Sequence, residues 1–202
     1  MGYNMKTQPQ ILKKKHEQIL QTSTYLFSRY GIRRISIEEI CRTAGVSKMT
    51  FYKYFSNKDA LIRFILDKLT RTHLDNFQRL MTSDIPFFEK VEKTIQIKLE
   101  QSDGLSQEFI DDVLQNTNEE IQRFMQEKLN LGLQMAKDYY SEAQRQGEIR
   151  DGVKIEFILY MLKQMREMVG DKRLSAFYSS PRELTAELMN FFFYGILSEK
   201  KR

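Results

Sequence analysis

The sequence has little that would support a disulfide-bonded, metal-binding or membrane-spanning protein. Its single cysteine, Cys41, has no partner for an internal disulfide, and its two histidines, His16 and His73, are too far apart in sequence to form a zinc-like ligand cluster. No apolar run approaches the roughly 20 residues that a bilayer requires, and the first ten residues lack the apolar core of a signal sequence. We therefore expect a cytoplasmic protein with no cofactor, no metal and no membrane contact.

Turn-forming residues and catalytic motifs are also scarce. Three prolines and nine glycines in 202 residues leave few turns for a many-stranded sheet, and the charged content of 29% suits helices. The sequence contains no phosphate-cradling glycine motif, no paired-histidine zinc motif and no nucleophile elbow. We expect an all-α protein that is not an enzyme.

The positive charge is concentrated at one end of the chain. Residues 1–58 contain 11 Lys and Arg against 3 Asp and Glu, a net charge of +8, and the other residues carry a net charge of −3. A basic head on a mildly acidic body suits binding to a polyanion, because each neutralised phosphate releases counterions. A basic tail without function is the alternative, but these residues are interleaved with helical apolar periodicity and so belong to folded structure.

Apolar periodicity predicts about nine helices. Glycines and prolines, including Gly31, Gly104, Gly147, Gly170 and Pro181, separate them. The expected helices span residues 11–30, 36–43, 48–54, 58–80, 87–101, 106–116, 118–146, 154–169 and 181–198.

The segment 36–54 encodes a helix, a tight turn and a second helix. Ser36 and Glu39 form a capping-box pattern, in which both side chains satisfy free backbone N–H groups at a helix start. Gly45 can adopt a positive φ in the turn, and Ser47 is a good N-cap for the next helix. Because one of two adjacent aromatic residues usually packs into the core, we assign Phe51 and Phe55 to the core. This succession of a helix, a tight turn and a second helix predicts a helix-turn-helix.

Residues 26–62 closely resemble the DNA-binding region of the TetR family of bacterial transcription factors. The resemblance covers about the first 65 residues and is carried by Leu26-Phe27, Gly31, Ile40, residues 44–47, Phe51-Tyr52, Tyr54-Phe55, Lys58 and Leu61. It implies an all-α homodimer with an N-terminal three-helix, helix-turn-helix DNA-binding domain at residues 1–57. A helical effector-binding and dimerisation domain follows at residues 58–202.

In a helix-turn-helix the second helix enters the major groove, and its N-terminal residues meet base edges. That helix is predicted at residues 47–54. Arg33 and Arg34 could contact DNA or form a solvated face. We expect Lys48, Met49 and Thr50 to set sequence preference, and Ser36, Ser47, Tyr52, Lys53, Tyr54 and Lys58 to contact the DNA backbone.

The two tyrosines have an alternative role in core packing. The resemblance implies that Tyr54 and Lys58 are phosphate contacts and that Tyr52 points into the groove. It also implies that two dimer-related recognition helices, ~34 Å apart, match a pseudo-palindromic double-stranded operator.

Two segments near the end of the sequence, residues 154–169 and 181–198, are apolar on more than one side. One small monomer can hardly cover both, so a second copy of the chain is the expected partner, and a monomer with a fuller core is the alternative. The resemblance implies that these helices pair with their copies in a four-helix bundle. The candidate dimerisation residues are Ile158, Met161, Leu162, Met165, Leu188, Phe191, Phe192 and Ile196.

The resemblance further implies a ligand cavity between the fourth helix and the next three. His73 lies on the inward stripe of the fourth helix and could meet a ligand, although a hydrogen-bonded core histidine is the alternative. Gly132 within a helix could make room for a ligand or for a neighbouring side chain. The abundant Met, Phe and Tyr suit a partly apolar small-molecule effector but would also form an ordinary core.

These features favour a sequence-specific transcriptional regulator, with repression as the default, that a small-molecule ligand releases from its operator by a shift in conformational population. The alternative is a DNA-bound structural or division-control protein without a small-molecule effector.

Overall fold

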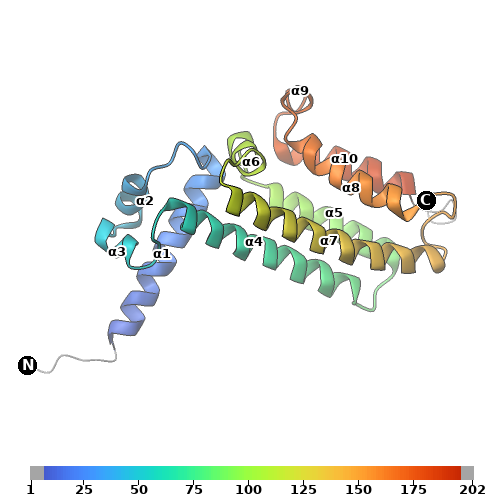
Figure 1. Ribbon diagram of the computed structural model, residues 1–202. Helices are drawn as coiled ribbons and strands as arrows, with labels where there is room; N and C mark the ends of the chain where they lie inside the picture. Colours follow the sequence, from blue (N-terminus) through green and yellow to red (C-terminus); the bar gives the residue numbers. More distant parts are fainter. Residues whose placement is uncertain (1–6, 197–202) are drawn as a thin grey trace, which may run out of the picture.

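A computed structural model describes residues 7–196, with side chains from residue 13 onward, and this part of the chain is all-α (Figure 1). The described helices are α1 (Thr7–Tyr30), α2 (Ile37–Ala44), α3 (Lys48–Tyr52), α4 (Lys58–Met81), α5 (Phe87–Ser102), α6 (Gln107–Leu114), α7 (Glu119–Arg145), α8 (Ile155–Val169), α9 (Lys172–Ser175) and α10 (Pro181–Ile196).

The nine predicted helices are confirmed, and one further helix, α9, was missed. α9 has a single turn, which is too short for apolar periodicity, and Asp171 caps it by accepting from the Arg173 and Leu174 N–H groups. α3 ends at Tyr52, two residues earlier than predicted. Residues 197 and 198 of the last predicted helix lie outside the described residues.

The helix-turn-helix forms because its local capping agrees with its buried aromatic residues. Ser36 Oγ accepts from Glu39 N–H at 3.1 Å, and Ser47 Oγ accepts from Thr50 N–H at 3.1 Å, so both serines are N-caps as predicted. Gly45 lies between the helices with φ of 64°. Phe51 is fully buried and Phe55 is 5% exposed, which confirms their assignment to the core.

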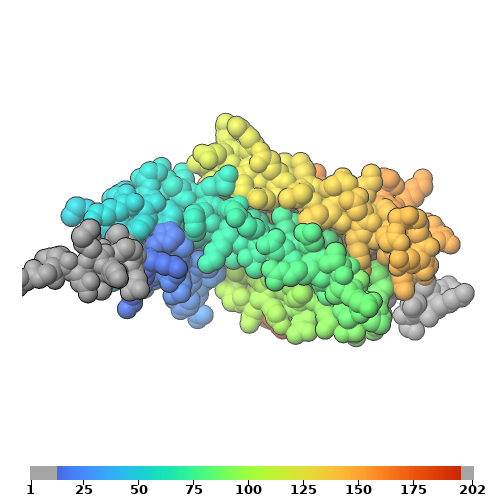
Figure 2. Space-filling model, turned by 90° about the horizontal axis from the view of Figure 1, so that it is seen from below, coloured from blue at the N-terminus to red at the C-terminus, as the bar shows by residue number. Residues whose placement is uncertain are grey.

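The body of the molecule is layered. α4 leaves the head and runs along the body, α5 and α7 lie next to it, and α8 and α10 form the far layer (Figure 1). From below, the molecule is elongated, with the described part of the head at one end (Figure 2). Tyr140, Ile158 and Phe192 belong to the core between α5, α7, α8 and α10. The helices α4, α5, α7, α8 and α10 thus surround the interior of the body.

The head is joined to the body through α6 and α7. Phe109 of α6 and Ile121 and Phe124 of α7 belong to the same buried cluster as the head residues, so apolar packing continues across the domain boundary predicted at residue 57. Gly31 adopts φ of 83°, and a Cβ there would lie 3.0 Å from both Asp112 Oδ2 and Glu108 Cβ. Only glycine suits this close approach of α6 to the end of α1.

Candidate functional site

α3 presents an exposed surface at the end of the head. Met49 is 73% exposed and Tyr52 is 53% exposed, and Ser47, Lys48 and Lys53 are exposed beside them. Thr50 is partly exposed, and its hydroxyl lies 2.9 Å from Ser47 Oγ. Ser36 is exposed at the start of α2. The candidate base-reading side chains therefore share one solvent-facing surface.

The two tyrosines near the end of α3 differ in their surroundings. Tyr52 points outward, whereas Tyr54 is partly buried and packs against the head core, with its ring 5.2 Å from the His16 ring. Lys58 is also partly buried: its Nζ lies 3.5 Å from the Arg33 carbonyl oxygen and 5.9 Å from the centre of the Phe27 ring. Burial lowers the pKa of Lys58. Lys58 therefore sits at the edge of the surface, close to the loop before α2.

Lys48 is paired with Glu38 of α2 in the free protein. The hydrogen bond between them lowers the pKa of the Glu38 carboxyl and raises the pKa of the Lys48 ammonium. Both side chains are more than half exposed, so the pair is open to solvent and to exchange of partners. Glu38 therefore competes with other acceptors for the Lys48 ammonium.

We predict that Glu38→Gln increases affinity for double-stranded DNA by ~2–5-fold, because it removes both a competitor for Lys48 and a negative charge beside the phosphates. Fluorescence anisotropy with a labelled duplex measures the change. Glu92→Gln, at an exposed position of α5, is the matched control because it also removes one carboxylate. An affinity no higher than that of the control would contradict this role of Glu38.

Arg33, which the sequence left open between DNA and solvent, contacts α6. Its Nε lies 3.1 Å from Asp112 Oδ1, its backbone N–H donates to Asp112 Oδ2 at 2.8 Å, and its Nη2 donates to the Gln115 carbonyl at 2.9 Å. Arg34 is exposed, with its guanidinium 5.8 Å from the centre of the Tyr30 ring. Arg33 thus ties the loop before α2 to the body.

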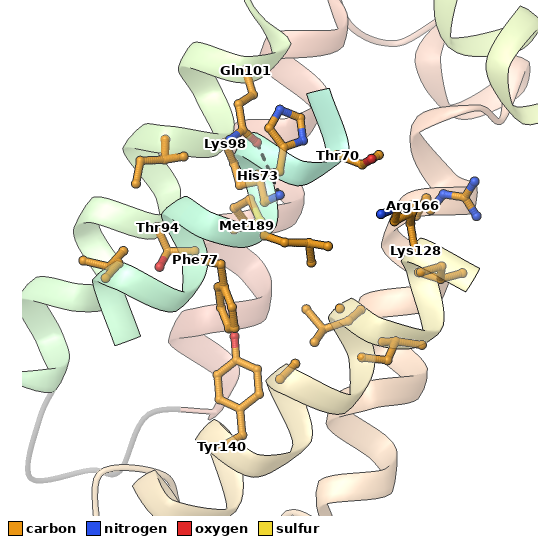
Figure 3. A pocket seen from close by; sticks show the side chains of 18 of the residues that line it. Thr70, His73, Phe77, Thr94, Lys98, Gln101, Lys128, Tyr140, Arg166 and Met189 are labelled. Carbon is orange, nitrogen blue, oxygen red and sulfur yellow. Dashed lines mark hydrogen bonds between the residues drawn. The ribbon is translucent and has the colours of Figure 1, made fainter. Parts of the chain in front are cut away.

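A cavity of about 330 Å³ lies inside the body (Figure 3). Its walls come from α4, α5, α7, α8 and α10, and both candidate ligand residues, His73 and Gly132, are among the lining residues. Burial, with a smaller contribution from the charge of Lys98, lowers the pKa of His73 to about 4, so its imidazole is neutral at neutral pH. A Cβ at Gly132 would lie 3.4 Å from Leu74 Cδ2, an ordinary van der Waals contact, so packing at this wall does not require a glycine.

Sequence reasoning did not select the other polar residues that line this cavity, among them Lys98, Tyr140 and Arg166. Lys98 follows the buried residues Val91 and Thr94 of α5 at helical spacing, but its own side chain is exposed, so the apolar stripe did not mark it. The positions of Tyr140 and Arg166 depend on the packing of α7 and α8.

The candidate dimerisation residues fall into two groups. Phe191 is 77% exposed, and Met161, Leu162 and Leu188 are partly exposed. Four others, Ile158, Met165, Phe192 and Ile196, are buried within the chain itself, because they pack onto α5 and α7. The exposed apolar surface of α8 and α10 also includes residues that the sequence analysis did not select: Phe157, Tyr160 and Tyr194.

Two further properties concern residues 7–196. No helix in this range combines the length and apolar character needed to cross a bilayer. In the same range, no group of three or more His, Cys, Asp or Glu side chains is arranged to hold a metal ion.

Comparison with known proteins finds similarity to bacterial transcriptional regulators. Residues 19–64 match the family model described as bacterial regulatory proteins, tetR family. The uncharacterized HTH-type transcriptional regulator YvdT of Bacillus subtilis (strain 168) is 38% identical over 74 residues, which are 37% of this chain. The match spans 38% of that relative's own length.

Solved structures share the fold over nearly the whole chain. The transcriptional regulator FadR from Bacillus subtilis, solved in complex with stearoyl-CoA, has a TM-score of 0.67 at 19% identity, covering 90% of this chain and 99% of that chain. A putative transcriptional regulator from Saccharomonospora viridis, solved in complex with choline, has a TM-score of 0.72 at 17% identity, covering 91% of this chain and 97% of that chain. At such identities the likeness establishes the fold.

Proposed function

The chain belongs to the TetR family of bacterial regulatory proteins, and from this we propose that it is a cytoplasmic, homodimeric, sequence-specific transcriptional regulator without enzymatic activity. In this proposal it represses by occupying a pseudo-palindromic operator, and a small-molecule ligand in the body releases it. Residues 1–57 serve as the DNA-binding domain and residues 58–202 as the effector-binding and dimerisation domain.

The observation that carries the DNA-binding proposal is the exposed surface of α3 on a fixed turn. Lys48, Met49 and Tyr52 project to solvent from a helix that Phe51 anchors in the core. A helix presented in this way fits the major groove, where Lys48 can donate to a guanine edge and Met49 can contact a thymine methyl. The net charge of +8 over residues 1–58 supplies the attraction to phosphate.

The backbone contacts are proposed from the residues around α3. Ser36 and Ser47 lie at helix starts, where hydroxyl and N–H groups favour phosphate, and Lys53 is exposed beside them. Thr50 stays a candidate base contact through its methyl group, because its hydroxyl lies 2.9 Å from Ser47 Oγ. Tyr54 and Lys58 can reach phosphate only at the margin of the surface, since both are partly buried.

We propose that a second copy of the chain binds to the exposed apolar surface of α8 and α10. Phe157, Tyr160, Phe191 and Tyr194 are each more than half exposed on these two helices. Exposed aromatic side chains are typical of protein interfaces. The proposed interface is centred on Phe191, with Met161 and Leu188 at partly exposed positions.

The ligand-responsive proposal is supported by the cavity and by the contacts that link it to the head. α4 provides His73 to the cavity and begins within the head, and α6 follows the cavity helix α5 and holds Arg33 through Asp112. A ligand that prefers one arrangement of these helices changes operator affinity by the same coupling free energy, typically ~1–3 kcal/mol. The cavity also favours this function over that of a structural DNA-binding protein without an effector.

The test is capture of genomic DNA fragments by the purified protein at several salt concentrations. We expect a pseudo-palindrome to be enriched, with affinity that falls steeply as salt rises. Salt-sensitive binding without a preferred sequence would overturn the regulatory proposal in favour of the structural one.

A further inference from the structure

Lys98 is the unusual residue of the cavity. It lies on α5 one turn after Thr94 and two turns after Val91, both of which are buried. Its own side chain is exposed and is among the residues that line the cavity. A cation on the wall of a largely apolar cavity can pair with the negatively charged group of a ligand.

The described residues that line the cavity include three cations and no carboxylate. Two of the cations are paired: Lys128 Nζ lies 3.3 Å from Asp67 Oδ1, and Arg166 Nη1 lies 3.5 Å from Glu167 Oε1. For Lys98 the contact within the described part of the chain is a neutral one, to Gln101 Oε1 at 3.4 Å (Figure 3). The charge of Lys98 therefore lacks a counter-ion there.

The rest of the wall is apolar or neutral. Leu74, Phe77, Ile97, Leu133, Met189 and Phe193 line it, and the Tyr140 hydroxyl points toward Phe77 at the end away from Lys98 (Figure 3). Burial raises the pKa of Tyr140, so the hydroxyl keeps its proton, and His73 beside Lys98 is neutral. The cavity thus offers one unpaired cation at one end and an apolar wall with a single neutral hydroxyl at the other.

We propose that the cavity binds a small carboxylate with an apolar ring or chain, whose carboxylate pairs with the Lys98 ammonium and whose apolar part packs between Phe77 and Phe193. This inference rests on the proposed function, because it names the chemical class of the effector. The volume of about 330 Å³ is near the lower end of small-molecule sites, which favours a single ring system or a medium-length chain.

Calorimetric titration of the full-length protein without DNA tests the charge requirement. Three probes share a decyl chain and differ in head group: decanoate, decan-1-ol and decylamine. Two further probes, 2-naphthoate and 2-naphthol, share an aromatic ring system. We expect at least one carboxylate to bind on the order of tenfold more tightly than its alcohol, and decylamine to bind most weakly of the decyl probes. Comparison of decanoate with 2-naphthoate shows whether the cavity prefers an apolar chain or an apolar ring. Alcohol or amine binding as tight as that of the carboxylates would overturn the proposal.

Variants of Lys98 test the residue. Lys98→Gln should lose on the order of tenfold in carboxylate affinity and leave alcohol affinity within about twofold, and Lys98→Arg should retain carboxylate binding. Lys93→Gln, at an exposed position of the same helix, should change neither. Circular dichroism checks that each variant is folded. Unchanged carboxylate affinity in folded Lys98→Gln would overturn the assignment.

Because these titrations contain no DNA, failure of the inference and failure of the proposed function are distinguishable. Carboxylate binding through Lys98 without any change in operator affinity would refute ligand release and leave the ligand class standing. Specific operator binding by a protein that binds none of the carboxylates would refute the ligand class and leave DNA recognition standing.

Discussion

Lys48→Ala is expected to reduce operator affinity on the order of a hundredfold in the dimer, about tenfold for each of two copies. The variant removes an exposed donor at the first turn of α3, where a recognition helix meets base edges. It should also relax the preference for one base pair in each half-site. Competition binding with operators altered at single positions measures both effects.

Two other lysines provide the comparison for Lys48. Lys53→Ala should weaken binding to all sequences alike and lower the salt dependence by about one counterion per contact, as expected for a phosphate contact. Lys68→Ala, at an exposed position of α4, should change little. If Lys48→Ala lowered affinity without altering base preference, Lys48 would be a backbone contact and the assignment would be wrong.

Phe191→Asp is expected to raise the dissociation constant of the dimer on the order of a hundredfold or more. The side chain is 77% exposed in one chain and lies at the centre of the proposed interface, so twofold symmetry would bury two unpaired carboxylates. Loss of the dimer should abolish tight operator binding, because a monomer can hold only one half-site. Sedimentation equilibrium and operator titration measure the two effects.

Leu131→Asp is the matched control for Phe191→Asp. Leu131 is 49% exposed on α7, outside the apolar surface of α8 and α10, so a new charge there should leave the dimer intact. A Phe191→Asp protein that stayed dimeric and bound its operator normally would place the interface elsewhere.

Local features of this fold could be predicted because neighbouring residues determine them. Ser36, Gly45 and Ser47 have side chains or backbone freedom that fix the ends of α2 and α3, and the spacing of Phe51 and Phe55 places both in the core. Each long helix likewise carries its own apolar stripe. The sequence was a poor guide to α9, whose single turn is defined by one Asp171 cap.

The roles of individual polar side chains depended on contacts between distant segments. Arg33 is adjacent to the helix-turn-helix in sequence, yet its guanidinium binds Asp112, 79 residues away. Lys98 became notable only when the cavity placed it among residues without a carboxylate. The apolar pattern of α8 and α10 indicated that both helices are buried on several sides, but it could not distinguish Phe192, which faces the core, from the exposed Phe191.

The most direct test of the central claim is the effect of half-site spacing on operator affinity. If one dimer places two α3 helices on one face of the DNA, inserting half a helical turn between the half-sites should reduce affinity to that of a single half-site, because the second half-site rotates to the opposite face. We expect this loss of affinity for the wild-type protein. Equal affinity for the native and the expanded operators, or for a lone half-site, would contradict it.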